Sequence, residues 1–97
     1  MTQYKHLIYI QSLLKRFLQG SINGEELEVL FNYYCSKYFD WVKLDNNDIL
    51  IIIEDLNEAL LFYEANPLIR KQHGSYFGDG KLKKIVLKIN KQLDKFL

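Results

Sequence analysis

The sequence predicts an all-α fold, an antiparallel four-helix bundle formed by one domain that spans residues 1–97. Apolar residues recur at steps of three and four along four stretches, which is the periodicity of amphipathic helices. The connections after the first two stretches are short, which favours antiparallel neighbours. A chain of 97 residues with 48% hydrophobic residues can build one core, so we expect a single domain.

The first two helices are predicted at residues 3–19 and 24–39. Thr2 is the candidate N-cap of the first, and Gly20 stands where a left-handed C-terminal cap is expected. Asn23 and Glu26 form a capping-box pair ahead of the second helix, with Ile22 and Leu27 as its hydrophobic staple. The inward face of the first helix is Leu7, Ile10, Leu14, Phe17 and Leu18, with Leu13 at its edge, and that of the second is Leu27, Leu30, Phe31, Tyr34 and Tyr38.

The other two helices are predicted at residues 46–65 and 80–96. Asp45 and Asp48 are candidate caps of the third helix, Asn66 before Pro67 ends it, and Asp79 is the candidate N-cap of the last. Trp41, Val42 and Leu44 are interpreted as a loop over one end of the bundle, and residues 66–79 as an irregular segment. The inward faces are Ile49, Ile52, Ile53, Leu56, Leu60 and Tyr63, then Leu82, Ile85, Val86, Ile89, Leu93 and Phe96. A buried Tyr63 phenol needs a hydrogen-bond partner or a path to water.

Nothing in the residue pattern predicts an enzyme. His73, Ser75 and Asp79 suit a hydrolytic triad on paper, but three residues of one loop rarely hold that geometry. The carboxylates of Glu54, Asp55 and Glu58 suit acid–base or metal chemistry, yet no histidine follows at ligand spacing. We therefore expect no catalytic residues, no metal and no cofactor.

The setting is expected to be the cytoplasm. Cys35 is the single cysteine, so no internal disulfide can form, and a reduced compartment is the simplest interpretation. The N-terminal residues lack the pattern of a signal peptide, and the longest apolar runs are too short to span a bilayer. We expect no membrane association.

Charge is strongly segregated along the chain despite a net charge of +1. Residues 1–24 carry three basic and no acidic residues. Residues 25–64 carry ten acidic residues against two basic ones, and residues 65–97 carry eight basic residues against two acidic ones. Such blocks can give a small domain a directional electrostatic field.

A lysine stripe is predicted on the last helix, formed by Lys81, Lys84, Lys88, Lys91 and Lys95. It could follow a phosphate backbone, which makes a small nucleic-acid-binding helical protein the alternative function. No arginine or aromatic residue interleaves the stripe, so we favour a solvated face without direct nucleic-acid binding.

The third helix carries a mixed stripe of Ile51, Asp55, Glu58 and Phe62, at i, i+4, i+7 and i+11. A face that met only water would not need the two large apolar residues. They either pack on the Trp41 link or the 66–79 segment, or they belong to a partner-binding patch in which carboxylates steer a basic partner.

The chain resembles the colicin-D-type bacterial immunity proteins. The likeness covers residues 14–22 (Leu-Lys-Arg-Phe-Leu-Gln-Gly-Ser-Ile) with Glu26 and Leu27, residues 53–56 (Ile-Glu-Asp-Leu), residues 62–64 (Phe-Tyr-Glu) up to Arg70, and residues 79–82 (Asp-Gly-Lys-Leu). The lysine-rich last helix departs from the family, as do Asn66, Leu68 and Ile69 at positions that could be acidic.

This resemblance implies an inhibitor that occupies the basic active site of a cognate nuclease toxin. The toxin would be a tRNA-cleaving bacteriocin or a contact-dependent growth-inhibition toxin. We expect the inhibitor itself to be a monomer or weak dimer. The resemblance places contacts at Glu54, Asp55 and Glu64, and the charge and stripe pattern adds Asp48, Ile51, Glu58 and Phe62.

Overall fold

The computed structural model describes residues 2–38 and 47–97. Within these ranges the chain forms the helices α1 (Thr2–Leu18), α2 (Gly24–Tyr38), α3 (Asn47–Phe62), α4 (Pro67–Gln72) and α5 (Asp79–Asp94). The β-type pairing found there is an isolated bridge between Tyr63 and Phe77. The predicted all-α class is confirmed.

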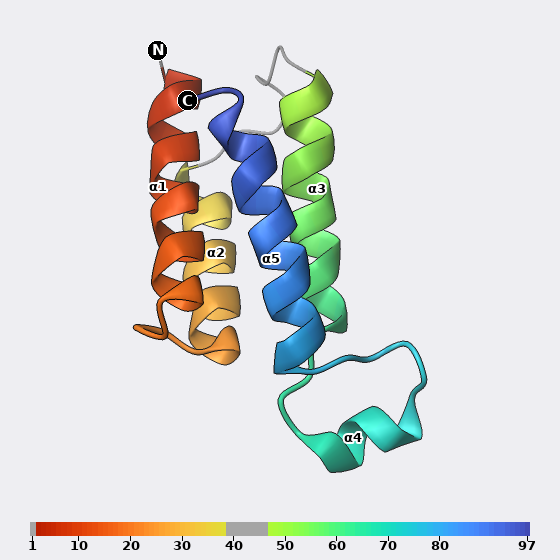
Figure 1. Ribbon diagram of the computed structural model, residues 1–97. Coiled ribbons are helices and arrows are strands. Elements are labelled where there is room, and N and C mark those ends of the chain that lie inside the picture. Colours follow the sequence, from red (N-terminus) through yellow and green to blue (C-terminus); the bar gives the residue numbers. More distant parts are fainter. Residues whose placement is uncertain (1, 39–46) are drawn as a thin grey trace.

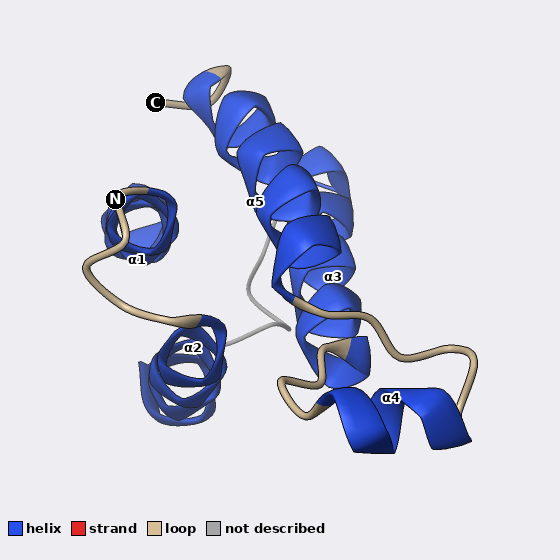
Figure 2. Cartoon of the chain, turned by 60° about the horizontal axis from the view of Figure 1, so that its bottom comes forward, coloured by secondary structure: helices blue, strands red, loops and turns tan. Residues whose placement is uncertain are grey.

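The long helices pack mainly through three neighbouring pairs. Helix α1 contacts both α2 and α5, and α5 also contacts α3. Figures 1 and 2 show α1 beside α2 and α3 beside α5, with the short α4 set apart at one end of the long helices. Helix α5 is therefore the element that joins the two pairs.

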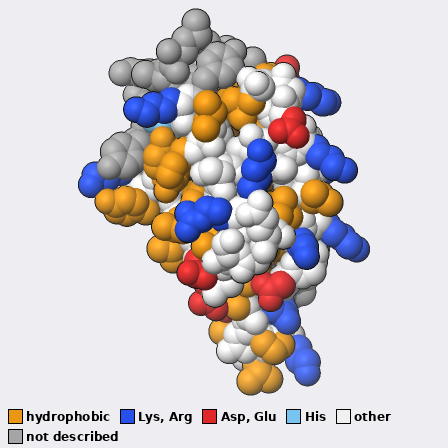
Figure 3. All heavy atoms as spheres, turned by 60° about the vertical axis from the view of Figure 1, so that its left-hand side comes forward, with side chains coloured by type: hydrophobic (Ala, Val, Ile, Leu, Met, Phe, Trp, Pro, Cys, Tyr) orange, Lys and Arg blue, Asp and Glu red, His pale blue; other side chains and the backbone are white. Residues whose placement is uncertain are grey.

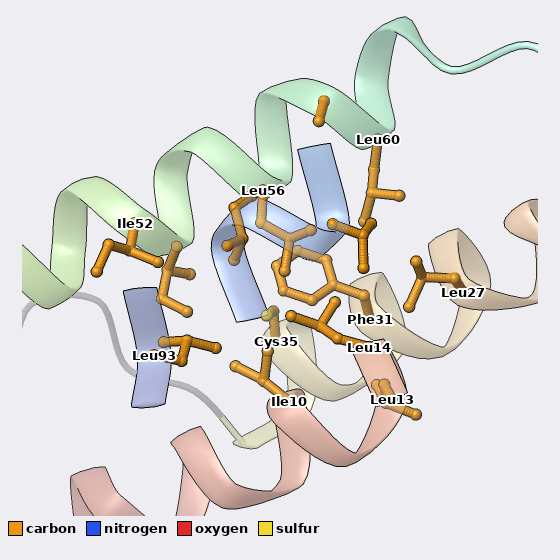
Figure 4. Close-up of a cluster of buried hydrophobic side chains, with 14 of the residues drawn as sticks. Ile10, Leu13, Leu14, Leu27, Phe31, Cys35, Ile52, Leu56, Leu60 and Leu93 are labelled. Carbon is orange, nitrogen blue, oxygen red and sulfur yellow. The ribbon is translucent and has the colours of Figure 1, made fainter. Parts of the chain in front are cut away.

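One apolar core lies between the long helices. Figure 4 shows Leu14 of α1, Phe31 of α2, Leu56 of α3 and Leu93 of α5 in the same cluster. Burial of each such side chain contributes roughly 1.5–3 kcal/mol. The predicted inward residues that are buried are Leu7, Ile10, Leu13, Leu14, Leu27, Phe31, Ile49, Ile52, Ile53, Leu56, Leu60, Tyr63, Leu82, Val86, Ile89 and Leu93. Those only partly buried are Phe17, Leu18, Leu30, Tyr34, Ile85 and Phe96.

The connection between α1 and α2 follows its predicted chemistry. Gly20 has a φ of 82°, the left-handed conformation that favours glycine after a helix. The Glu26 amide donates to Asn23 Oδ1 at 2.8 Å, and the Asn23 amide donates to Glu26 Oε1 at 3.0 Å. The capping box is therefore confirmed, and it fixes the residue at which α2 begins.

The prediction that the third helix continues to Ala65 and is followed by an irregular segment is wrong. Helix α3 ends at Phe62, and residues 67–72 form α4. The Phe77 amide donates to the Phe62 carbonyl at 3.0 Å, and the Glu64 amide donates to the Phe77 carbonyl at 2.9 Å. These bonds draw residue 63 out of the helix.

Helix α4 forms because Asn66 and Pro67 also suit a helix start. The Leu68 amide donates to Asn66 Oδ1 at 2.9 Å, and Pro67 occupies the first turn, where its missing N–H costs nothing. From the sequence, Pro67 is predicted only as the end of the preceding helix. The same residue begins the next one.

The predicted N-cap role of Asp79 is also wrong. Gly78 is the N-cap of α5, with no side-chain cap bond, and Asp79 is the first helical residue. The Asp79 carboxylate instead accepts a 2.6 Å hydrogen bond from the Tyr63 hydroxyl, which supplies the partner that the buried phenol was predicted to need. The predictions for Trp41, Val42, Leu44, Asp45 and the side chains of Thr2 and Tyr38 lie outside what the structure describes.

Candidate partner-binding surface

The predicted mixed stripe lies on the outside of α3. Ile51 is 54% exposed and Phe62 is 38% exposed, and the side chains of Asp55 and Glu58 between them are exposed as well. Neither apolar side chain is therefore buried by α4 or by the segments that flank it. The stripe therefore presents apolar and anionic groups together, which is the arrangement expected of a partner-binding patch.

A groove of about 390 Å³ runs between this stripe and α5. Helix α3 contributes Asp55, Glu58 and Phe62 to one wall, and α5 contributes Lys81 and Lys88 to the other. The remaining lining residues are Ala59, Ser75, Phe77, Ile85, Ile89 and Gln92. Three of the four stripe residues, Asp55, Glu58 and Phe62, thus form one wall of the groove, and Ile51 lies outside it.

The two walls of this α3–α5 groove carry opposite charges, which do not form ion pairs with each other among the described residues. Among the described residues, neither Asp55 nor Glu58 forms an ion pair with a lysine. Lys81 instead places its ammonium 5.0 Å from the centre of the Phe77 ring, within cation–π range. Both carboxylates therefore remain open to an incoming cationic group.

The sequence did not predict the cationic wall. The sequence predicts one solvated stripe of five of the six lysines of the last helix, yet Lys81 and Lys88 line the groove, whereas Lys84, Lys91 and Lys95 do not. The available signal was the spacing of Lys81, Ile85, Lys88 and Gln92 at i, i+4, i+7 and i+11, which repeats the mixed pattern of α3.

Glu64 does not line the groove, unlike Asp55, Glu58 and Phe62. Its backbone carbonyl accepts a 2.6 Å hydrogen bond from Arg70. Burial raises the pKa of Glu28 on α2, and the nearby carboxylates of Glu64 and then Glu25 raise it further, which places Glu64 on the α2 side. Asp48 and Glu54 are exposed on α3 but do not line the groove.

The segment that leads from α3 to α5 is braced around Arg70. Its Nη1 donates to the carbonyls of Glu64 at 2.6 Å and Ala65 at 3.1 Å. The same guanidinium packs against Gly78, where an added Cβ would lie 2.7 Å from Nη1. Arg70 therefore connects residues 64 and 65 with residue 78, which follows the groove residue Phe77.

Exposed apolar side chains also occur away from the groove. Ile8, Val29 and Tyr33 are exposed on α1 and α2, and the Lys37 ammonium lies 5.4 Å from the centre of the Tyr33 ring. Figure 3 views the molecule from the α1 side and shows separate apolar patches with polar and basic atoms between them. The α3 stripe differs from these patches because it borders a hollow and carries carboxylates.

Two of the three residues considered for hydrolysis, Asp79 and His73, make other contacts, and Ser75 lines the groove. Asp79 binds the Tyr63 hydroxyl, and the His73 ring makes an edge contact with Tyr76 at 5.4 Å between centres. In the described ranges, no group of three histidine, cysteine, aspartate or glutamate side chains is arranged to hold a metal ion. None of the helices in these ranges combines the length and the apolar character needed to cross a membrane.

Comparisons with known protein families, with curated proteins and with solved structures found no match to this chain.

Proposed function

We propose that this chain is an immunity protein that binds a cognate bacterial nuclease toxin and blocks its basic active site. The observation that carries the proposal is the groove wall formed by Asp55, Glu58 and Phe62. Its two carboxylates are exposed, form no ion pair with a lysine among the described residues, and lie beside the accessible ring of Phe62. Carboxylates in this setting can substitute for substrate phosphates against cationic groups. The resemblance to colicin-D-type immunity proteins supports the same proposed function.

The rest of the proposal follows from this role. The chain acts by occupation rather than catalysis, in the cytoplasm of the producing cell, as a monomer or weak dimer without metal or cofactor. Its long helices form an antiparallel four-helix bundle, a finer arrangement supported by the packing of α5 against both α1 and α3.

The proposal predicts that a gene next to this one encodes a toxin with a nuclease domain, and the test uses that domain. Cells that express that domain should survive when this chain is co-expressed. Reversing the charges of Asp55 and Glu58 together to lysine should abolish protection, because two attractive contacts become repulsive.

The matched control reverses Glu25 and Glu28 of α2, which changes the net charge equally but lies off the groove. It should leave protection intact. Full protection by the Asp55→Lys, Glu58→Lys protein would exclude this wall as the interface, and lack of protection by the unaltered chain would end the proposal.

A second candidate is nucleic-acid binding by Lys84, Lys91 and Lys95, whose exposed side chains lie outside the groove. A filter-binding titration with RNA at several salt concentrations tests it. Binding that weakens steeply with salt, and that is lost after all three lysines are changed to glutamine, would favour this candidate.

A further inference from the structure

Acidic and basic side chains line opposite walls of the α3–α5 groove. Asp55 and Glu58 stand on one wall and Lys81 and Lys88 on the other, with Phe62 and Phe77 as aromatic lining. Its volume of about 390 Å³ is near the lower end of ligand-sized pockets, which span about 300–1,000 Å³. It can receive a few side chains of a partner, but not a whole helix.

A uniformly basic partner would fit this groove poorly. A cation that approached Asp55 and Glu58 would also approach Lys81 and Lys88, and like charges placed together across an interface are costly. The ammonium groups cannot be ignored, because among the described residues no carboxylate of this chain neutralises them by an ion pair. An anionic group on the partner, placed beside its cationic group, removes this cost.

We propose that the groove binds a bipolar segment of the toxin. One arginine or lysine of that segment faces Asp55 and Glu58, one aspartate or glutamate faces Lys81 and Lys88, and an apolar side chain lies against Phe62 and Phe77. This proposal rests on the proposed function and deepens it: the inhibitor recognises a pair of opposite charges, not positive charge alone.

The two ideas predict opposite signs for one substitution pair. If the toxin surface is only basic, changing Lys81 and Lys88 to glutamate should tighten binding, since it adds attraction. If the surface is bipolar, the same change should weaken binding by about tenfold or more, because close charge pairs across an interface are lost and replaced by repulsion.

The experiment measures affinity for the purified nuclease domain by calorimetry and by inhibition of its RNA cleavage. The variants are Lys81→Glu with Lys88→Glu, and the milder Lys81→Gln with Lys88→Gln, which should weaken binding less but in the same direction. The matched control is Lys84→Glu with Lys91→Glu, which has the same charge change on the same helix but outside the groove. It should leave the affinity within about threefold, or tighten it slightly. Circular dichroism confirms that each variant is folded.

Several results would overturn the bipolar groove. Unchanged or tighter binding by both Lys81 and Lys88 variants overturns it while leaving the proposed function intact, provided that reversal at Asp55 and Glu58 abolishes binding. Equal weakening by the Lys84 and Lys91 control also overturns it, because the effect would then be a long-range field. A self-association by light scattering that disappears in the Lys81→Glu, Lys88→Glu protein would make a second copy the occupant. Failure of the unaltered chain to bind the domain overturns both proposals.

Discussion

Replacing Gly24 with alanine should destabilise the protein, although alanine normally favours a helix. Gly24 begins α2 and lies under the ring of Tyr63, so an added Cβ would stand 2.5 Å from the Tyr63 hydroxyl oxygen and 2.8 Å from Cε2. Ordinary contacts begin near 3.4 Å. Tyr63 is 6% exposed and its hydroxyl is bonded to Asp79, so its ring cannot move aside without losing packing or that bond.

The magnitude follows from two opposing terms. Alanine for glycine in a helix contributes about 0.5–1 kcal/mol, whereas overpacking costs about 1–3 kcal/mol. We expect a net loss of about 1–2 kcal/mol in the free energy of unfolding, or a fall in Tm of about 5–10 °C for a domain of this size.

Gly80 provides the matched control because it also lies in the first turn of a helix and an added Cβ there meets nothing within 4 Å. Urea unfolding followed by circular dichroism should show Gly80→Ala equal to or slightly more stable than the unaltered protein. In a Tyr63→Leu background, the penalty of Gly24→Ala should shrink. A Gly24→Ala protein as stable as the original would mean that Tyr63 does not pack against the start of α2.

Three further predictions concern other parts of the fold. Gly20→Ala should cost about 1 kcal/mol, since a φ of 82° strains any residue with a Cβ even in open space, and Gly20→Asn should recover part of it; equal stability of all three in urea would contradict this. Burial raises the pKa of the Cys35 thiol from 9.0 to about 11, so the unfolded chain ionises first and the free energy of unfolding should fall by about 1–2 kcal/mol as pH rises from about 9 to about 11. Cys35→Ala should remove that part of the slope, and an unchanged pH profile would argue against a buried thiol. Arg70→Met should speed amide exchange in residues 63–78, because two backbone carbonyls lose their donor, while α1 and α2 exchange as before. Exchange is measured by mass spectrometry, and an unchanged rate in residues 63–78 would show that the Arg70 contacts do not stabilise this segment.

The long helices could be predicted because their signals are local. Apolar spacing defined which faces are buried, and the Asn23–Glu26 pair defined the start of α2 before any tertiary contact was considered. Tyr63 was placed on the inward face by spacing alone, and it is buried. Each of these features depends on residues within about two helical turns of one another.

The failures share a different cause. Helix α3 ends early because Phe77, 15 residues downstream of Phe62, supplies competing backbone bonds, and sequence spacing carries no sign of that pairing. Asp79 resembles an N-cap by residue type, but the Tyr63 hydroxyl occupies its carboxylate. Pro67 did carry a local signal for α4, which required reading it as a helix start as well as a helix end.

Charge shows most clearly how the fold changes what the sequence implies. Residues 25–64 and residues 65–97 are blocks of opposite sign, and a block of one sign suggested a directional field. The structure packs α3 against α5, so part of the acidic block and part of the basic block face one groove. At distances larger than their separation the two opposite charges largely cancel, and salt screens what is left beyond a Debye length of about 8 Å, so only a partner in contact interacts with each sign separately. Recognition at this groove should then depend on close complementarity, which acts on dissociation more than on long-range attraction.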